Sequence, residues 1–138
     1  MKAIYRSIIL LILVSQASCS QEKLGPGGST IEGTWRLYER GSSPGSGYYV
    51  ETISPIPLQS LTFTKKGEVY RQGDLKGPFP FTSPYYRVVT LLGDLKIQFI
   101  NSKKEESTDY LGLRIFGDTM RITPSCFEGC HYGFARVR

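Results

Sequence analysis

From about residue 31 onward, apolar residues recur at every second position almost everywhere, and this alternation constrains the fold more than any other feature. Successive side chains of a β-strand point to opposite faces, so the pattern is typical of strands with one buried face. Leu111, Leu113 and Ile115, for example, alternate with Tyr110, Gly112 and Arg114. No stretch longer than about ten residues has the apolar spacing of an amphipathic helix. The sequence therefore predicts an all-β fold.

Short turns divide this pattern into hairpins. The turns are Lys65-Lys66-Gly67, Gly93-Asp94 and Gly117-Asp118, and the strands beside them are expected at 61–64 and 68–72, 85–92 and 95–100, and 108–116 and 119–123. Two further strands are expected at 34–40 and 131–138, and a weaker one at 48–53. Alternation in the first places Trp35, Leu37 and Glu39 on one face. We expect an antiparallel meander of about eight or nine strands that closes into an up-and-down β-barrel, because closure removes exposed edges.

The first nineteen residues have the layout of an export signal. Lys2 and Arg6 precede an apolar run at 8–14, and two small residues then precede Cys19. The run is too short to cross a bilayer core of about 30 Å. The stretch 16–19 resembles the lipobox of bacterial lipoproteins, in which the cysteine is lipidated and becomes the new N-terminus. A signal-peptidase cut after Ala17, which would leave a secreted soluble protein, is the open alternative.

These features predict the domain organisation and the location of the chain. We expect a signal peptide at residues 1–18, a lipidated Cys19 with a Gly- and Pro-containing tether at 19–30, and one domain at 31–138. The protein would then be exported and held on a bacterial envelope membrane by its lipid. The net charge is +5, but the basic residues are scattered. A nucleic-acid partner is not expected, because its footprint clusters basic residues on one face.

Three cysteines are an odd number for an exported chain. Setting Cys19 aside for lipid leaves Cys126 and Cys130 as a pair, which we expect to form a disulfide in an oxidising compartment. The alternative is a metal site built from this pair with Glu128 and His131. No second Cys/His cluster completes such a site, so no metal and no other cofactor is predicted.

Three segments, taken in order, resemble the lipocalin-like domains of exported bacterial lipoproteins. Gly33-Thr34-Trp35 resembles the G-x-W start of that group, 61–67 its Leu-Thr-Phe-x-x-x-Gly hairpin, and 126–130 its C-x-E-G-C segment. The resemblance covers 31–138 and implies a lipocalin-like, calycin-type barrel in which Arg136 covers Trp35. Gly33, Trp35 and Arg136 are therefore expected to be fold residues. The resemblance implies no ligand, because fold does not determine function.

The expected function is binding of a small hydrophobic or amphipathic molecule inside the barrel. Adjacent tyrosines in a strand face opposite ways, so only one of each pair at 48–49 and 85–86 can face the interior. The candidate ligand-binding residues are Tyr48, Tyr86, Phe63 and Leu113. The alternative is a surface interaction or structural module whose barrel is filled by its own side chains. The sequence identifies no protein partner.

Catalytic chemistry has little support in the sequence. The only histidine, His131, has no evident nucleophile near it in the chain. Glu32, Glu39, Asp74 and Asp118 are spaced as single turn or surface charges rather than as a catalytic pair. We therefore predict no catalytic residues and no enzyme, although a barrel can bring distant residues together.

Overall fold

The computed structural model describes residues 30–75, 82–101, 109–126 and 129–138. The predicted signal peptide, Cys19 and nearly all of the tether lie outside these residues. The described strands are β1 (Gly33–Ser42), β2 (Tyr49–Thr52), β3 (Ser60–Phe63), β4 (Val69–Gln72), β5 (Tyr85–Leu91), β6 (Asp94–Ile100), β7 (Leu111–Phe116), β8 (Thr119–Thr123) and β9 (Cys130–Arg136). The described residues form no helix, which confirms the all-β prediction. Among them, accordingly, no helix has the length and apolar character to span a membrane.

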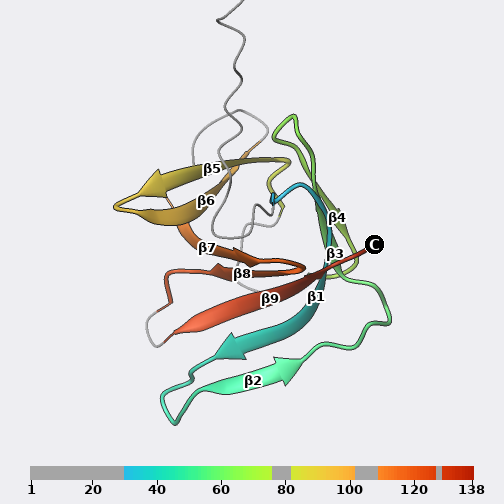
Figure 1. Cartoon of the computed structure of the whole chain (residues 1–138). Helices are drawn as coiled ribbons and strands as arrows, with labels where there is room; N and C mark the ends of the chain where they lie inside the picture. The colour runs from blue at the N-terminus through green and yellow to red at the C-terminus, as the bar shows by residue number, and fades with distance from the viewer. Residues whose placement is uncertain (1–29, 76–81, 102–108, 127–128) are drawn as a thin grey trace, which may run out of the picture.

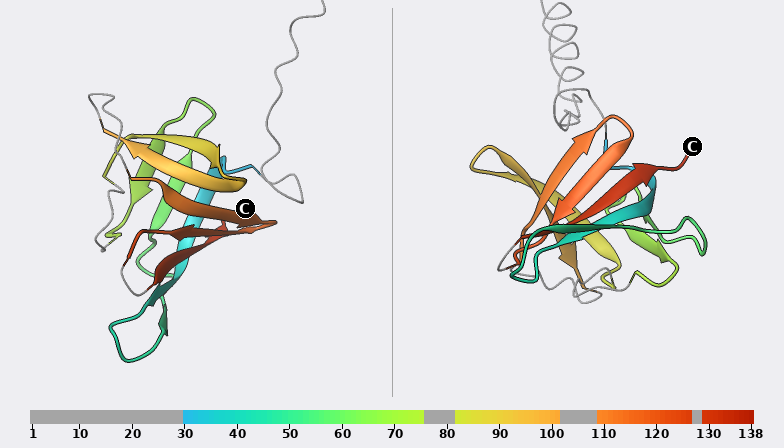
Figure 2. Two further views of the ribbon diagram at one scale, coloured as in Figure 1. Left: turned by 90° about the vertical axis from the view of Figure 1, so that its left-hand side faces the viewer. Right: turned by 90° about the horizontal axis from the view of Figure 1, so that it is seen from below.

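The strands form one antiparallel sheet that curves into an open half-barrel (Figures 1 and 2). Eight strands follow the order β4-β3-β1-β9-β8-β7-β6-β5, and β2 pairs with β1 beside this path. The first and last of the described strands, β1 and β9, lie side by side from Trp35–Arg136 to Ser42–Cys130. At the two ends of the path, a single bridge joins Glu68 to Tyr85. The predicted antiparallel meander is therefore present in the form of an open half-barrel.

The three predicted hairpins are confirmed as β3–β4, β5–β6 and β7–β8. The first strand is longer than predicted, because β1 continues through Gly41 to Ser42. At Gly41 and Ser42, β1 pairs with both β2 and β9, and this pairing keeps Gly41 in extended backbone. Part of the loop predicted at 73–83 and all of the turn predicted at 103–106 lie outside the described residues.

One face of the sheet, which we call the core face, packs into a single apolar cluster. Its members are Ile31, Trp35, Leu37, Ile53, Leu61, Phe63, Val69, Leu75, Ile97, Phe99, Leu111, Leu113, Ile115, Met120, Ile122, Tyr132 and Phe134. Trp35, Leu61 and Phe134 are completely buried. Burial of each large apolar side chain stabilises the fold by about 1.5–3 kcal/mol, so this cluster holds the strands together.

A β-bulge in β1 reverses the alternation of side chains along that strand. Leu37 pairs with Phe134 and Glu39 pairs with Gly133, so Tyr38 is an extra residue without its own partner position. Leu37 therefore lies on the core face and Glu39 on the opposite face. The prediction that Glu39 shares a face with Leu37 is wrong, because strict alternation takes no account of the bulge.

Candidate functional site

A cleft lies where β6 and β7 separate. These strands pair only through Lys96 with Gly112 and Ile97 with Leu111. Beyond these pairs a cavity of about 800 Å³ lies between the tip of the β5–β6 hairpin and the β7–β8 hairpin. In Figure 1 the β5–β6 hairpin stands away from β7. The cavity is lined by Tyr48, Thr90, Gly93, Asp94, Leu95, Lys96, Gly112, Leu113, Arg114, Ile115, Phe116, Arg121, Thr123, Gly129, Cys130 and His131.

The pairing register places a second group of side chains on the face opposite the core. Arg114 pairs with Arg121, Arg121 with Gly133, and Gly133 with Glu39. Directly paired residues share a face, and so do residues two positions apart, which adds His131 to the group. We call this surface of β7, β8, β9 and β1 the polar face. It meets the cleft at Arg114, Arg121 and His131.

A buried histidine lies at the centre of the polar face. His131 is 4% exposed. Its Nε2 lies 2.9 Å from Glu39 Oε1, and its Nδ1 is hydrogen-bonded to the Tyr48 hydroxyl. Arg121 Nη2 donates to the same Glu39 oxygen at 3.0 Å. Four residues from β1, β8, β9 and the segment before β2 are thus joined in one network.

The chemistry of these groups determines the direction of the hydrogen bonds. An ionised carboxylate only accepts, so His131 Nε2 carries the proton shared with Glu39. In the neutral imidazole, Nδ1 then accepts the proton of the Tyr48 hydroxyl. The histidine therefore orients Tyr48, which is half exposed and lines the cleft. The arrangement positions a hydroxyl group at the wall of the cavity.

The state of Glu39 follows from its surroundings. Burial acts to raise the pKa of this carboxyl group, but the hydrogen bonds from His131 and Arg121 and the positive charge of Arg121 hold the pKa below its usual value of 4.5. The Glu39 side chain is only 17% exposed. A partly buried carboxylate that is held ionised by two donors anchors both of them through charge-assisted hydrogen bonds.

Two glycines provide the space that this network occupies. A Cβ atom at Gly133 would lie 2.7 Å from Glu39 Oε1 and 2.8 Å from its Cδ. A Cβ atom at Gly41 would collide with the His131 ring and the Tyr48 hydroxyl. Both glycines lie inside strands, where glycine otherwise weakens packing and often marks a close approach of another group.

The structure brings together two of the four candidate ligand-binding residues. Tyr48 and Leu113 line the cleft. Phe63 and Tyr86 are absent from its described lining and instead pack edge to face against each other, with ring centroids 4.8 Å apart. The Tyr86 hydroxyl donates to the Thr64 carbonyl at 2.8 Å, so its polar end is already satisfied within the fold.

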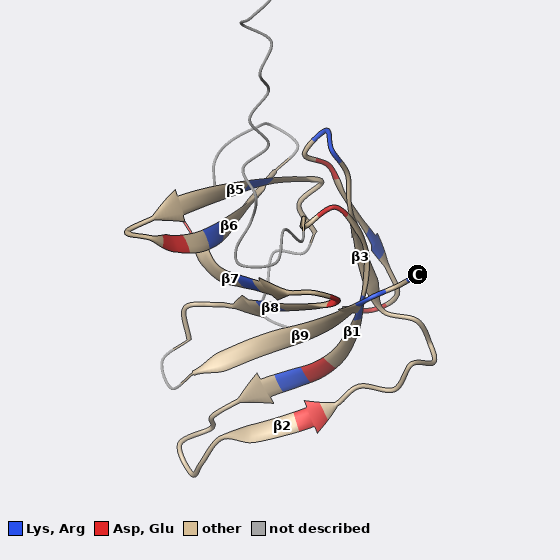
Figure 3. Ribbon diagram, viewed as in Figure 1, with Lys and Arg blue, Asp and Glu red and all other residues tan. Residues whose placement is uncertain are grey.

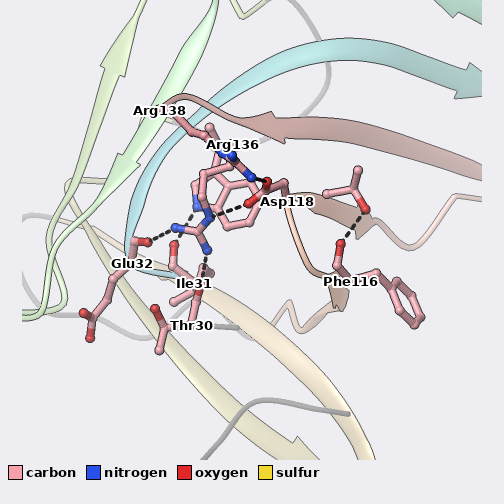
Figure 4. Close-up of polar contacts among 9 residues, drawn as sticks. Thr30, Ile31, Glu32, Phe116, Asp118, Arg136 and Arg138 are labelled. Carbon is pink, nitrogen blue, oxygen red and sulfur yellow. Dashed lines mark hydrogen bonds and ion pairs between the residues drawn. The ribbon is translucent and has the colours of Figure 1, made fainter. Parts of the chain in front are cut away.

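The fold residues meet at the start of β1. The Arg136 guanidinium lies 4.1 Å from the centre of the Trp35 ring, in a cation–π contact. As Figure 4 shows, Arg136 also donates to the carbonyls of Glu32 and Thr30, each at 2.7 Å. The Trp35 Nε1 donates to the carbonyl of Ile31 at 2.6 Å. These contacts tie the entry into β1 to the end of β9.

Gly33 is required at this junction for two reasons. Its φ of +117° lies in a region that L side chains rarely adopt. A Cβ atom there would also lie 2.8 Å from Arg136 Nη1. The glycine of the G-x-W segment therefore gives the arginine access to the carbonyls beside Trp35.

Cys126 and Cys130 lie at disulfide-bonding distance, with their Cα atoms 6.0 Å apart. Cys130 begins β9 beside the cleft, so the cross-link would hold the loop that leads to His131. Glu128, which belongs to the alternative metal set, lies outside the described residues. Within the described part of the chain, no group of three or more His, Cys, Asp and Glu side chains could hold a metal ion.

The network residues Glu39, His131 and Arg121 were not predicted to act together. Glu39 and His131 are 92 positions apart, and the bulge that brings Glu39 to the polar face leaves no sequence pattern. The available signal was a glycine inside each of two strands, Gly41 and Gly133. Comparison with known proteins finds no matching family model, no matching curated protein and no matching solved structure.

Proposed function

We propose that this protein is a lipid-anchored, lipocalin-like protein of a bacterial envelope that binds a small amphipathic molecule in the cleft between β6 and β7. The observation that carries the binding proposal is the cavity of about 800 Å³. Small-molecule sites have about this volume and combine apolar walls with a few oriented polar groups. Leu113 and Ile115 supply apolar wall here, and Tyr48 and Arg121 supply oriented polar groups.

The strand order supports the lipocalin-like part of this proposal. β1 pairs with β3 on one side and with β9 on the other. The Glu68–Tyr85 bridge lies where the two ends of the path meet, and the Val69 amide donates to the Pro84 carbonyl there at 2.9 Å. Taken with these contacts, the strand order is the cyclic order of an up-and-down barrel. We therefore propose a barrel that is joined at this point and in which β6 and β7 separate beyond their two residue pairs.

The packing of the core face favours the cleft over the barrel interior as the binding site. Trp35, Phe63, Phe99 and Phe134 are all essentially inaccessible to solvent. Side chains of this size fill the interior of a small barrel. The ligand site predicted for the interior is therefore proposed at the cleft instead.

A fluorescence titration with the apolar probe N-phenyl-1-naphthylamine tests this function. Thr123 is exposed and lines the cleft, so Thr123→Trp should fill the cavity and weaken probe binding by at least about tenfold. Thr52 is also an exposed strand threonine but lies on β2, outside the lining. Thr52→Trp should leave the affinity unchanged. Probe binding that Thr123→Trp does not reduce would refute the cleft as the site.

The exposure of β2 favours a second function, that of a surface interaction module. All four residues of β2 are exposed, and Tyr49 and Val50 are each more than half exposed. An exposed strand edge is a template for pairing with another chain. If β2 pairs with another chain, Val50→Lys should abolish that association, which sedimentation velocity would detect. Val50 lies outside the cleft lining, so the same substitution should not affect probe binding in the cleft.

A further inference from the structure

Two arginines lie directly opposite each other at the wall of the cleft. Arg114 on β7 and Arg121 on β8 are paired residues of the same hairpin, and both line the cavity. Like charges in this position repel each other and destabilise a strand pair. Figure 3 shows one basic position on β6, which is Lys96, and this residue lines the cleft as well. Three cationic side chains therefore surround one cavity.

The described acidic groups balance these charges only in part. Arg121 is paired with Glu39, but His131 uses the same carboxylate oxygen. No described residue forms a hydrogen bond or ion pair with Arg114. Asp94 is the single acidic residue among the described lining. The cleft therefore carries excess positive charge, which its low-dielectric walls concentrate.

The remaining wall is apolar. Leu95 lies on the β6 side, Leu113 and Ile115 lie on β7, and Phe116 at the end of β7 is 61% exposed. An exposed phenylalanine beside two arginines offers contact to an apolar chain whose charged end the arginines hold. Guanidinium groups bind carboxylate and phosphate oxygens in pairs, with directed hydrogen bonds.

We infer that the molecule bound in the cleft is an amphipathic anion, whose carboxylate or phosphate group lies between Arg114 and Arg121 and whose apolar chain lies against Phe116, on the same face of β7 as Arg114. This inference rests on the proposed binding function and names the class of its ligand. The anion supplies the counter-charge that the Arg114–Arg121 pair lacks. It competes with Glu39 for Arg121, while His131 keeps its hydrogen bond to Glu39.

Calorimetric titration of the full chain with four ligands of equal chain length tests the inference. The ligands are decanoate, decyl phosphate, decanol and decyltrimethylammonium. At low ionic strength, at least one of the two anions should bind about tenfold or more tightly than decanol. This preference should shrink as salt screens the cleft. The ratio of the two anion affinities then assigns the head group as carboxylate or phosphate.

Two arginine variants locate the effect. Arg114→Gln should remove most of the preference for the anions over decanol. Arg71→Gln makes the same charge change on β4, at an exposed arginine outside the cleft lining, and should preserve the preference. Equal binding of decanoate, decyl phosphate and decanol would overturn the inference and leave the proposed function standing, as would tighter binding of the cation. Failure of all four ligands to bind would overturn both.

Discussion

Replacing Trp35 by alanine should destabilise the fold without touching the cleft. The indole ring is completely buried, its Nε1 donates to the Ile31 carbonyl, and Arg136 lies over its face. Truncation of a buried tryptophan costs about 3–5 kcal/mol. The cation–π contact, about 0.5–2 kcal/mol, is part of the same loss rather than a fully additive one, because the groups touch. We therefore expect the free energy of unfolding to fall by about 3–5 kcal/mol.

Thermal unfolding followed by circular dichroism measures this effect. Each kcal/mol corresponds to about 4–8 °C in a domain of this size, so the Tm should fall by at least about 12 °C. Trp35→Phe is the matched control: it keeps a buried ring, loses the hydrogen bond to Ile31, and should cost clearly less than the alanine variant. Binding of decanoate is measured at a temperature where both variants remain folded, and should be retained.

One result would refute this reasoning. If Trp35→Ala left the Tm unchanged and abolished decanoate binding, Trp35 would be a ligand residue rather than a fold residue. The cation–π contact between Arg136 and Trp35 would then position a binding surface rather than join β1 to β9.

Four further predictions follow from the polar face and the cysteines. Gly133→Ala should displace the Glu39 carboxylate and lower the free energy of unfolding by about 1–3 kcal/mol, measured by urea denaturation; an unchanged midpoint would contradict the role given to this glycine. Because the pKa of Glu39 is lowered on folding, the contribution of this carboxylate to stability should be fully present above pH 4.5 and lost as the pH falls through the folded-state pKa. The free energy of unfolding should therefore depend less on pH in Glu39→Gln than in the wild type. Equal slopes of unfolding free energy against pH in the two proteins would contradict the role given to Glu39. Cys19→Ala should move the protein from the membrane to the soluble fraction, whereas an intact mass that shows an unmodified chain beginning at Ser18 would exclude lipidation. Non-reduced peptide mapping should find Cys126 linked to Cys130, and free thiols or a stoichiometric metal would contradict the cross-link.

The local elements of the fold could be predicted from the sequence, because local physics forms them. Alternation in 111–116 specifies a strand with one buried face whatever it pairs with. Gly93 and Gly117 adopt positive φ values at hairpin turns, which is a property of the residue itself. The hairpins and the absence of a substantial helix could therefore be predicted from local patterns, namely the alternation of apolar residues and the positions of turn glycines.

The candidate site could not be predicted from the sequence, because it depends on how strands far apart in the chain pair. A single bulge at Tyr38 moves Glu39 from the core face to the polar face, and a shift of one residue leaves the composition of the strand unchanged. The cleft exists because β6 and β7 pair through only two residue pairs. Alternation determined by itself that β-strands would form, and in β7 and β8 it also determined which residues would be buried. Only the tertiary structure decided that Glu39, His131 and Arg121 would meet, since the register between β1, β8 and β9 arises from pairing and not from the sequence of any one strand.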